Sequence, residues 1–412
     1  MSLNSTPKAN RVHIAFFGKT NAGKSSLINA VTNQNLAIVS KVRGTTTDPV
    51  YKSMELLPIG PVTMIDTAGL CDEGELGTLR EEKTLEVLNK TDIAVVVFEC
   101  SEEADFSFEV NLVEEIKNRK IPVVPVLNKN DLVEDYSVIK KNIEKSIGMK
   151  LHSVSALKKQ GIEELKNFIG KLAPEDEDKF KIIGDLISPG DFVVLVTPID
   201  KSAPKGRLIL PQQQTIRDIL ESDAMAIVTK EHELRDTLNK LGTKPKMVVT
   251  DSQAFLKVSA DTPEDILMTS FSILFARHKG DLNILVKGAR KIDDLEDGDK
   301  ILIAEGCTHH RQTDDIGTVK IPRWLRQMTG KDLEFHHVSG VEFTKDVEQY
   351  ALIVHCGGCM LNHRAMGFRI DSADGFEVPI VNYGVLIAYV HGILDRALEP
   401  FPLAKIIWEK EA

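Results

Sequence analysis

The chain has few cysteines, no excess of positive charge and no long apolar run. Five cysteines in 412 residues are too few for a disulfide framework. A net charge of −10, without a stripe of basic and aromatic residues, argues against a large nucleic-acid surface. Residues 1–12 lack the apolar core of a signal peptide, and the apolar stretch 378–394 is shorter than a membrane span. We therefore expect a cytoplasmic protein with neither a nucleic-acid nor a membrane partner.

The remaining composition is that of an ordinary globular protein. Apolar residues make up 42% of the chain and charged residues 27%, and the length suffices for about two to four domains with real cores. Short apolar runs alternate with helical patterns along the whole sequence. This alternation predicts an α/β protein.

A glycine-containing loop lies between an expected strand, residues 12–17, and an expected helix. Its spacing is that of a P-loop, which wraps phosphate in backbone N–H groups at the positive end of a helix. Lys24 is expected to reach the β- and γ-phosphates, and Ser25 to bind Mg²⁺. The residues predicted to contact the nucleotide here are Gly18, Asn21, Ala22, Gly23, Lys24, Ser25 and Ser26.

Two further segments match the γ-phosphate side of such a site. Thr46 lies in the polar segment 44–48 and is expected to close on Mg²⁺ when a γ-phosphate is present. Asp66 ends a strand-like run and is expected to bind Mg²⁺, directly or through water, while Gly69 can donate its backbone N–H to the γ-phosphate. Together with Lys24, these three residues form the predicted catalytic set.

The base side of the site follows two apolar runs, residues 93–98 and 123–127, which are typical of parallel strands buried on both faces. Asp131 can accept hydrogen bonds from guanine N1–H and the N2 amino group, which adenine does not offer. The residues predicted around the base are Asn128, Lys129, Asp131, Ser155 and Ala156.

With these motifs in order, residues 12 to about 172 resemble the Era/MnmE class of translation-factor GTPases. The resemblance implies GTP hydrolysis to GDP with Mg²⁺. Asn21 and the Gly44-Thr45-Thr46 segment are similar to members activated by potassium, in which the asparagine helps to hold K⁺ beside the phosphates. Leu70 stands where Ras-like proteins carry a water-orienting glutamine. We therefore expect slow, K⁺-dependent hydrolysis.

Residues 173–279 are predicted to form a second, smaller α/β domain after an acidic linker at 173–179. Expected strands are 192–196, 224–228 and 247–250. One helix is expected to begin with Thr229 as its cap and to end before Gly242. Another is expected to begin at 262–265 and to carry Ile266 through Phe275. No phosphate loop or metal cluster is found here, which favours a role in assembly.

Residues 280–412 contain three cysteines that follow strand-like runs. Cys307 comes after the run 300–304, and Cys356 and Cys359 come after the run 351–354. If these two runs are neighbours in a parallel sheet, Cys307 and Cys356 can meet at its carboxyl edge. Three thiolates suit iron–sulfur or zinc and not calcium or magnesium. A redox pair or chance remains the alternative for a lone CxxC. Later strand-like runs at 333–338 and 378–381 and a helix at 386–398 complete the predicted domain.

The pattern Cys307-Thr308-His309 followed by His355-Cys356-Gly357-Gly358-Cys359 resembles the cluster motif of the FeFe-hydrogenase maturation GTPases. The resemblance spans nearly the whole chain and implies three domains: a P-loop GTPase (1–172), a dimerisation domain (173–279) and a 4Fe–4S domain (280–412). It further implies a scaffold or carrier for the two-iron precursor of the hydrogenase active site. The implied partners are radical-SAM maturation enzymes, apo-hydrogenase and a second copy of the chain.

Three cysteines leave one iron of such a cluster without a thiolate. His309 and His355 are candidates for that iron, or for hydrogen bonds around the cluster, and the sequence does not decide between these roles. An RNA- or ribosome-associated, K⁺-dependent GTPase with a zinc-stabilised C-terminal domain is the competing interpretation. A metal sensor with a regulatory GTPase domain is a third.

Overall fold

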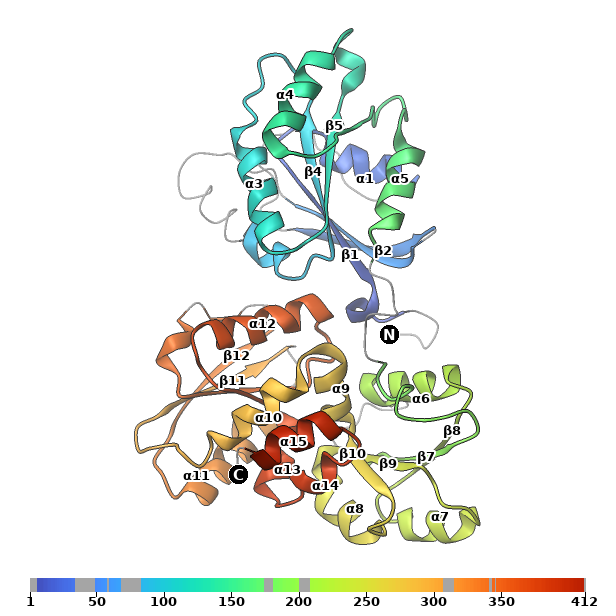
Figure 1. The fold of residues 1–412 in the computed structure, drawn as a ribbon, viewed down its shortest axis with the longest axis vertical. Helices are drawn as coiled ribbons and strands as arrows, with labels where there is room; N and C mark the ends of the chain where they lie inside the picture. Colours follow the sequence, from blue (N-terminus) through green and yellow to red (C-terminus); the bar gives the residue numbers. More distant parts are fainter. Residues whose placement is uncertain are drawn as a thin grey trace. The chain divides into compact units, whose positions relative to one another are not determined.

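The computed structural model describes residues 6–33, 49–57, 59–67, 83–173, 181–199, 208–306, 315–340, 343–344 and 346–410. The chain divides into two compact units, residues 1–176 and residues 177–412 (Figure 1). Within the described residues, no helix is both long enough and apolar enough to cross a membrane. The predicted division of the second unit at residue 279 stays a prediction.

The first unit is built on a six-stranded sheet in the order β2-β3-β1-β4-β5-β6. Only β2 runs antiparallel to its neighbour, at one edge of the sheet. Strands β4 and β5 are apolar along nearly their whole length because both faces of the sheet are covered. The strands are β1 (Val12–Phe17), β2 (Val50–Leu56), β3 (Gly60–Asp66), β4 (Ile93–Glu99), β5 (Val123–Asn128) and β6 (His152–Ser153).

Helices lie on both faces of this sheet (Figure 1). Alternate residues of a strand point to opposite faces, so Ile14 and Phe16 pack with α1 and α5, whereas Ala15 and Phe17 pack with α3 and α4. The result is a three-layer α/β unit with an apolar core on each side of the sheet. Its helices are α1 (Lys24–Thr32), α3 (Ser107–Asn118), α4 (Ser137–Ile147) and α5 (Ile162–Lys171), with short 3₁₀ turns η1 (Lys8–Asn10) and η2 (Asn130–Leu132).

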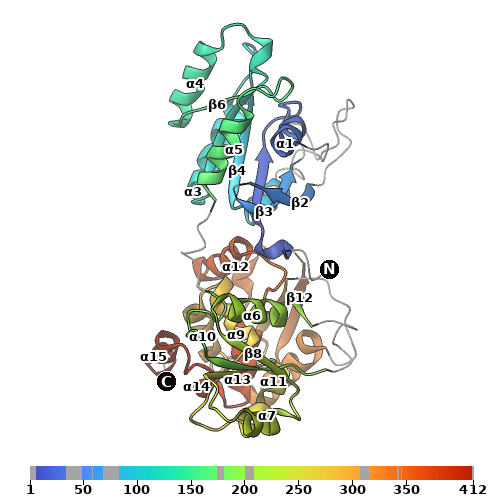
Figure 2. The same ribbon diagram turned by 90° about the vertical axis from the view of Figure 1, so that its right-hand side faces the viewer.

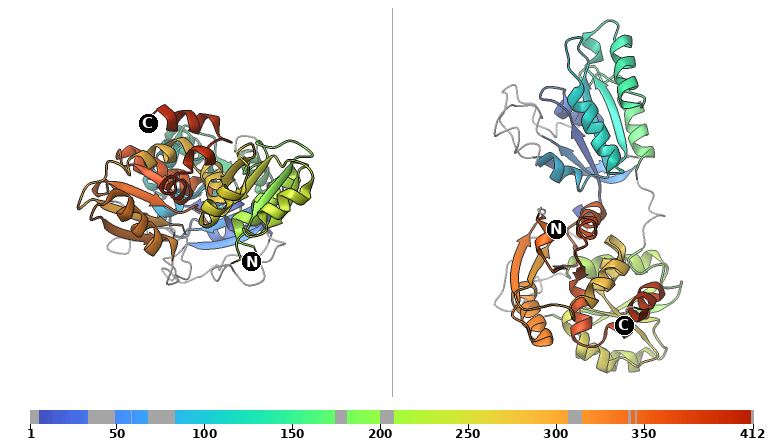
Figure 3. Two further views of the ribbon diagram at one scale, coloured as in Figure 1. Left: turned by 90° about the horizontal axis from the view of Figure 1, so that it is seen from below. Right: turned by 60° about the vertical axis from the view of Figure 1, so that its left-hand side comes forward.

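The second unit contains two four-stranded sheets, in the orders β10-β9-β7-β8 and β12-β11-β13-β14. Every strand pair in both sheets is parallel (Figures 2 and 3). One hydrophobic core includes residues from both sheets. The strands of the first sheet are β7 (Phe192–Val196), β8 (Met225–Thr229), β9 (Met247–Thr250) and β10 (Leu267–Ser270). Those of the second are β11 (Lys300–Glu305), β12 (Glu334–Ser339), β13 (Leu352–His355) and β14 (Ile380–Asn382).

Helix α9 follows β10 directly and packs against α12 and α13, which belong to the part of the chain that forms the second sheet. It therefore joins the two sheets into one unit. The helices of this unit are α6 (Leu210–Glu221), α7 (Leu234–Leu241), α8 (Phe255–Asp261), α9 (Phe271–Lys279), α10 (Leu282–Arg290), α11 (Ile321–Thr329), α12 (His363–Gly375), α13 (Tyr383–Val390), α14 (Leu394–Ala397) and α15 (Pro402–Lys410). Shorter turns are η4 (Ser252–Ala254), η5 (Ile316–Lys320) and η6 (Val347–Gln349).

The α/β fold with an N-terminal P-loop unit followed by further α/β structure is confirmed, but two predicted helix starts are wrong. Thr229 is the last residue of β8, where it pairs with Val196, and α7 begins five residues later. Residues 267–270 form β10 against β9, because their apolar side chains complete the sheet, and α9 begins only at Phe271 with Ser270 as its cap. The acids at 264 and 265 precede a strand and not a helix.

The single helix predicted at 386–398 is also wrong. The structure has two helices, α13 and α14, separated by His391, Gly392 and Ile393. Gly392 has a φ of 69°, which ends the first helix because an α-helix requires negative φ. The remaining predicted strands of this region are present, with ends shifted by one or two residues.

Candidate functional site

The P-loop runs from the end of β1 to the start of α1. Gly18 has a φ of 143°, and a Cβ there would lie 2.4 Å from the carbonyl oxygen of Val97. Gly23 has a φ of 87°, and a Cβ there would lie 2.4 Å from Asn128 Nδ2. Both positions therefore require glycine, the first for close approach to β4 and the second for close approach to the base-side loop.

Lys24 and Asn21 occupy different environments in this loop. Lys24 is buried, and its Nζ donates to the carbonyl oxygens of Gly18 at 2.9 Å and Lys19 at 3.0 Å. Asn21 is exposed and has a φ of 67°. The lysine is thus held over the loop that wraps phosphate, while the asparagine amide is accessible from solvent. Ala22 is buried, and Ser26 lies in the first turn of α1.

Ser25 and Asp66 meet beside the P-loop. Ser25 Oγ donates to Asp66 Oδ2 at 2.6 Å, and Asp66 Oδ1 is buried without a hydrogen-bond partner in the described residues. Burial raises the pKa of Asp66, while Ser25 and Lys24 lower it. A hydroxyl and a carboxylate at this spacing, with one orphaned oxygen, are a donor set that fits Mg²⁺.

Asn128 connects the P-loop to the base-side loop. Its Nδ2 donates to the carbonyl oxygen of Ala22 at 3.0 Å, and its Oδ1 accepts from the N–H of Ala156 at 3.1 Å. Asn128 is buried, so both bonds are shielded from water. One side chain therefore fixes the phosphate and base segments relative to each other.

Asp131 lies next to Ser155, and a hydrogen bond from the Ser155 side chain holds the pKa of Asp131 below its usual range. Lys129 has a φ of 65° and pairs with Glu99 through Nζ and Oε1 at 2.6 Å. An ionised carboxylate beside the loop that carries Ala156 is the arrangement expected for guanine recognition. The structure thus brings together every described residue of the predicted base side.

Glu109 is a site residue that the sequence did not indicate. It is 2% exposed on α3, and its Oε1 accepts from the backbone N–H of Lys19 at 3.2 Å. Oε2 lies 3.8 Å from Lys19 Nζ, and Asp105 also bonds the Lys19 ammonium. Burial raises the pKa of Glu109. In a sequence, an acid in the first turn of a helix indicates only a favourable helix dipole.

Two predicted residues of the nucleotide site, Thr46 and Gly69, lie outside the described residues, as do Leu70 and Cys71. Cys100, the remaining cysteine of this unit, is 2% exposed at the end of β4, and burial raises its pKa. Its environment is that of an inert, buried thiol.

The second candidate site lies at the carboxyl edge of the second sheet in residues 177–412. Strands β11 and β13 are parallel neighbours, with Ala304 opposite His355. The N–H of Gly306 donates to Cys356 Sγ at 3.1 Å, and the N–H of Gly358 approaches the same sulfur at 3.4 Å. The two cysteine-bearing runs are thus parallel neighbours, which is the condition stated above for a shared cysteine site.

The loop from Cys356 to Cys359 is held by a buried lysine. Lys279, the last residue of α9, donates to the carbonyl oxygens of Gly358, Cys359 and Leu361 at 3.2, 3.0 and 2.8 Å. Burial lowers the pKa of Lys279 to about 8, and the two cysteines act in the opposite direction. Burial also raises the pKa of each thiol. Both cysteines are free, and Gly358 with a φ of 58° allows the chain to turn between them.

His355 points into a buried hydrogen-bond network. Arg369 Nη1 donates to His355 Nε2 at 2.8 Å, so the other ring nitrogen, Nδ1, carries the proton and donates to the carbonyl oxygen of Cys356 at 2.6 Å. Burial and the Arg369 charge lower the pKa of His355 to about 3. The ring is therefore neutral, and both of its nitrogens are engaged.

The described part of this site supplies two thiols but not a third donor. Cys307 and His309 lie outside the described residues, and among the described ones no three His, Cys, Asp or Glu gather as a metal-binding group. At the same sheet edge, Asn382 pairs in register with His355 and is buried, and its Nδ2 has no partner in the described residues. Two thiols that accept backbone N–H bonds, beside an orphaned amide donor, are chemistry that fits an iron–sulfur cluster.

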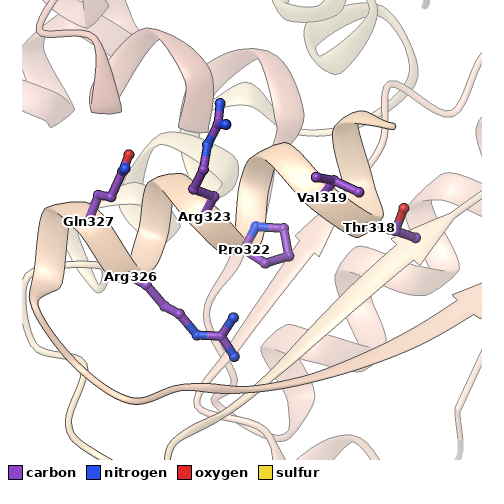
Figure 4. A pocket seen from close by; sticks show the side chains of 6 residues that line it. All are labelled: Thr318, Val319, Pro322, Arg323, Arg326 and Gln327. Atoms are coloured by element: carbon purple, nitrogen blue, oxygen red, sulfur yellow. The ribbon is translucent and has the colours of Figure 1, made fainter. Parts of the chain in front are cut away.

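A separate pocket of about 430 Å³ lies on η5 and α11. Figure 4 shows Arg323 and Arg326 leaving α11 in different directions, so the two guanidinium groups do not converge on one anion. Arg326 Nη2 instead donates to the carbonyl oxygen of Leu333 at 2.8 Å. The pocket is lined by Thr318, Val319, Pro322, Arg323, Arg326 and Gln327, none of which is a thiol, histidine or carboxylate.

Curated relatives that match part of the chain include tRNA modification GTPases. The tRNA modification GTPase MnmE of Endomicrobium trichonymphae is 34% identical over 193 residues, covering 46% of this chain and 41% of the relative. MnmE of Helicobacter pylori strain J99 is 40% identical over 134 residues, covering 31% and 28%. The chain thus spans less than half the length of these relatives.

Solved structures of Era also match. Aquifex aeolicus Era bound to GDP and AlF4⁻ has a TM-score of 0.37 at 19% identity, covering 56% of this chain and 98% of that one. Era in complex with MgGDPNP and a segment of 16S ribosomal RNA has a TM-score of 0.36 at 19% identity, covering 55% and 95%.

Three family models match successive parts of the chain. The 50S ribosome-binding GTPase model matches residues 13–129, so the first unit is a GTPase domain. The hydrogen maturase F dimerization domain matches residues 182–280, and the hydrogen maturase F tetramerization domain matches residues 283–400, which indicates self-association. These last two models together cover more than half of the whole chain, and they follow a GTPase domain. The chain therefore belongs to the hydrogen maturase F family of hydrogenase maturation GTPases.

Proposed function

We propose that this protein hydrolyses GTP and acts as a scaffold that binds a 4Fe–4S cluster and carries the two-iron precursor to apo FeFe-hydrogenase. The observation that carries the proposal is the parallel pairing of β11 and β13, with the Gly306 N–H on Cys356 Sγ at 3.1 Å. Gly306 is the last described residue before Cys307 in the sequence. A third thiolate within reach of the other two is what cluster binding requires.

In this proposal Cys307, Cys356 and Cys359 hold the cluster. The cluster would supply one iron that can bind a further iron unit through a bridge. His355 acts around the cluster and not on iron, because Arg369 occupies its Nε2 lone pair and Nδ1 donates to the Cys356 carbonyl. His355 then fixes the backbone of Cys356. His309 remains the histidine proposed for the fourth iron, which a carrier would leave exchangeable.

For GTP hydrolysis, Lys24 would leave its loop carbonyls for the β- and γ-phosphates, since the phosphate oxygens carry more charge. Ser25 and Asp66 would hold Mg²⁺, which neutralises charge on the phosphates. Thr46 would complete the Mg²⁺ shell, and the Gly69 N–H would bind the γ-phosphate. Asp131 would select guanine. Asn128 would hold the base loop next to the P-loop through its two hydrogen bonds.

We further propose that Asn21 binds K⁺ beside the phosphates. The support is its exposed position in the P-loop, together with the likeness of its motif to K⁺-activated GTPases. GTP turnover should be faster in KCl than in NaCl at equal ionic strength, and Asn21→Ala should remove that difference without preventing nucleotide binding. Equal rates of the unsubstituted protein in both salts would exclude a K⁺ site at Asn21.

Hydrolysis would act as a switch and not as an energy source for iron chemistry. A switch requires that the GTP and GDP states bind a partner with different affinities. Binding of a radical-SAM maturation enzyme and of apo-hydrogenase should therefore be measured with a non-hydrolysable GTP analogue and with GDP. Equal affinities in the two states would remove the switch.

The proposed surface for self-association is the outer edge of β8. This strand ends its sheet, and Met225 and Val228 on it are 41% and 45% exposed. An edge strand offers unpaired backbone groups, and apolar side chains along it favour pairing with another copy. The surface lies within the segment that matches the dimerization domain model.

The direct test is anaerobic reconstitution with iron and sulfide, followed by EPR of the reduced protein and a transfer assay to apo-hydrogenase. We expect a 4Fe–4S signal and activation of the hydrogenase by protein loaded with the two-iron unit. Cluster uptake without transfer would favour the metal-sensor interpretation. Stable tetrahedral zinc with no cluster uptake would favour the competing function.

That competing function is an RNA- or ribosome-associated GTPase with a structural zinc site. The names of the N-terminal matches, a tRNA modification GTPase and a 50S ribosome-binding GTPase, favour it for the first unit. The two hydrogen maturase F models favour the scaffold for the second. A salt-dependent complex with ribosomal RNA, tested by filter binding, would support the competing function.

A further inference from the structure

Lys279 lies beneath the loop that carries Cys356 and Cys359. Its side chain is 2% exposed, and its ammonium group bonds three backbone carbonyls, all of them in residues 358–361. An ammonium has three N–H donors, so these bonds use all of them. The carbonyl of Lys279 in turn accepts from His363 Nδ1 at 2.7 Å if that nitrogen is protonated, which joins the end of α9 to the start of α12.

The packing around this position leaves little freedom. A Cβ at Gly280 would lie 2.7 Å from Ile370 Cδ1, so α9 and α12 are in close contact immediately after the lysine. The Lys279 ammonium also lies 5.5 Å from the centre of the Phe275 ring. The charge is therefore fixed in place by the helix that bears it and by the loop that it binds.

A buried ammonium needs negative charge nearby, because taking an uncompensated ion out of water costs several kcal/mol. In the described residues, Lys279 forms no ion pair with a carboxylate. The groups at hand that can become negative are Cys356 and Cys359, whose thiols lose their protons when they bind a metal and which act electrostatically on Lys279. A cluster held by three thiolates is an anion and becomes more negative on reduction.

From this geometry we infer that Lys279 is a positioning residue with two roles: it sets the conformation of the cysteine loop, and it is the buried counter-charge for the bound cluster. The inference rests on the proposed cluster site. The first role depends only on the three carbonyl bonds that the chain makes with itself. The second follows because a fixed positive charge stabilises the reduced, more negative state more than the oxidised one.

Two substitutions separate the roles. Lys279→Met removes the charge and the donors while keeping a similar length. Lys279→Gln removes the charge but retains an amide that can donate two hydrogen bonds. Lys291→Met is the matched control, because it makes the same change in net charge at an exposed lysine of the same unit.

The loop role is measured in metal-free protein by amide hydrogen exchange of residues 356–361. We expect at least tenfold faster exchange in Lys279→Met, a smaller increase in Lys279→Gln, and none in Lys291→Met. Exchange in β11 and β13 should stay slow, which shows that the sheet remains folded. Unchanged exchange of the loop in Lys279→Met would overturn the positioning role.

The charge role is measured by redox titration of the reconstituted protein, followed by EPR. Both Lys279→Met and Lys279→Gln should shift the midpoint potential to more negative values, and Lys291→Met should leave it in place. A potential that does not move in Lys279→Gln overturns the counter-charge role. If the unsubstituted protein takes up no cluster, that role falls with the proposed function, and hydrogen exchange alone decides the loop role.

Discussion

The two candidate sites both lie where parallel strands end, but they are built differently. In residues 1–176 the predicted P-loop residues are contiguous, and a single neutral side chain, Asn128, ties them to the base loop. In residues 177–412 the two described thiols follow one strand, the third is expected after another, and a buried cation, Lys279, fixes the loop between them. The difference follows from the ligand.

A nucleotide brings its own charge, spread over several phosphates and neutralised by Mg²⁺ and Lys24. Its site needs backbone N–H groups in sequence, which a short motif supplies. An iron–sulfur cluster needs soft anions from separate directions, and these must be buried together. Their repulsion and desolvation require cations inside the protein, and Lys279 and Arg369 supply such charge, at 2% and 1% exposure. Such cations carry no sequence motif.

The largest effect is expected from removing a thiol. Cys356→Ser should abolish nearly all of the 4Fe–4S EPR signal after reconstitution, because one iron loses its ligand and the serine cannot replace the soft thiolate. GTP affinity should not change. Cys100→Ala, a change at the buried cysteine of the GTPase domain, is the control and should leave the iron content unaltered. A full cluster signal in Cys356→Ser would exclude this cysteine as a ligand.

The corresponding change at the nucleotide site should be milder and should alter specificity. In Asp131→Asn the side chain no longer accepts both guanine hydrogen bonds, each worth about 1.5–3 kcal/mol to a charged group, so GTP binding should weaken roughly 10²-fold. Xanthosine triphosphate should bind more tightly, because its second carbonyl can accept from the new amide. Fluorescence titration with labelled nucleotides measures both affinities.

Asp135→Asn is the matched control for this experiment. Asp135 is exposed and accepts from the Ser137 N–H at 2.9 Å, beyond the base-side residues. The substitution makes the same change in charge and should leave GTP affinity within about twofold, as surface substitutions usually do. If Asp131→Asn still prefers GTP over xanthosine triphosphate, a residue other than Asp131 recognises the guanine base.

Much of the fold followed from apolar runs. The segments 93–98 and 123–127 are continuous apolar runs, as expected for strands of a sheet that is covered on both faces. The errors came where local and tertiary signals disagree. Thr262 to Asp265 has the composition of a helix start, yet β9 needs a neighbour, and residues 267–270 supply it.

The binding motifs were likewise predictable, but the buried charged residues that hold the motif segments in place were not. The adjacency of β11 and β13 was a condition for the cysteine site, and the structure fulfils it. Glu109, Lys279 and Arg369 are single charged residues in helical segments, where sequence favours a solvated face. Their roles depend on which segment each helix packs against, and that is set by packing over long separations in the chain.

A smaller effect is expected from a substitution that weakens self-association through residues 177–412 and leaves the GTP site of residues 1–176 unchanged. In Val228→Lys, like charges would meet across a symmetric β8 pairing, and each dimer contains the change twice. We expect the dissociation constant to rise about tenfold or more, corresponding to at least about 1.4 kcal/mol. Light scattering over a concentration series measures it. Leu403→Lys, at a residue 62% exposed outside both hydrogen maturase F matches, should have no effect, and neither variant should alter GTP affinity.

The smallest expected effect is a pH-dependent one at Glu109, the buried carboxylate of the GTPase domain. Burial raises its pKa in the folded state, so the folded protein holds the proton more tightly than the unfolded one. The stabilisation is therefore full below the unfolded pKa of 4.5 and is lost as the pH rises through the raised value. Glu109→Gln mimics the protonated form and should slow hydrogen exchange of β1 and β4 at neutral pH. This advantage should shrink as the pH falls toward 4.5.

Glu114→Gln, exposed on the same helix, is the control. If this advantage stays constant across the range, Glu109 acts through packing alone. The contrast between the two candidate sites would then rest only on Lys279 and Arg369, the buried cations of the cysteine site.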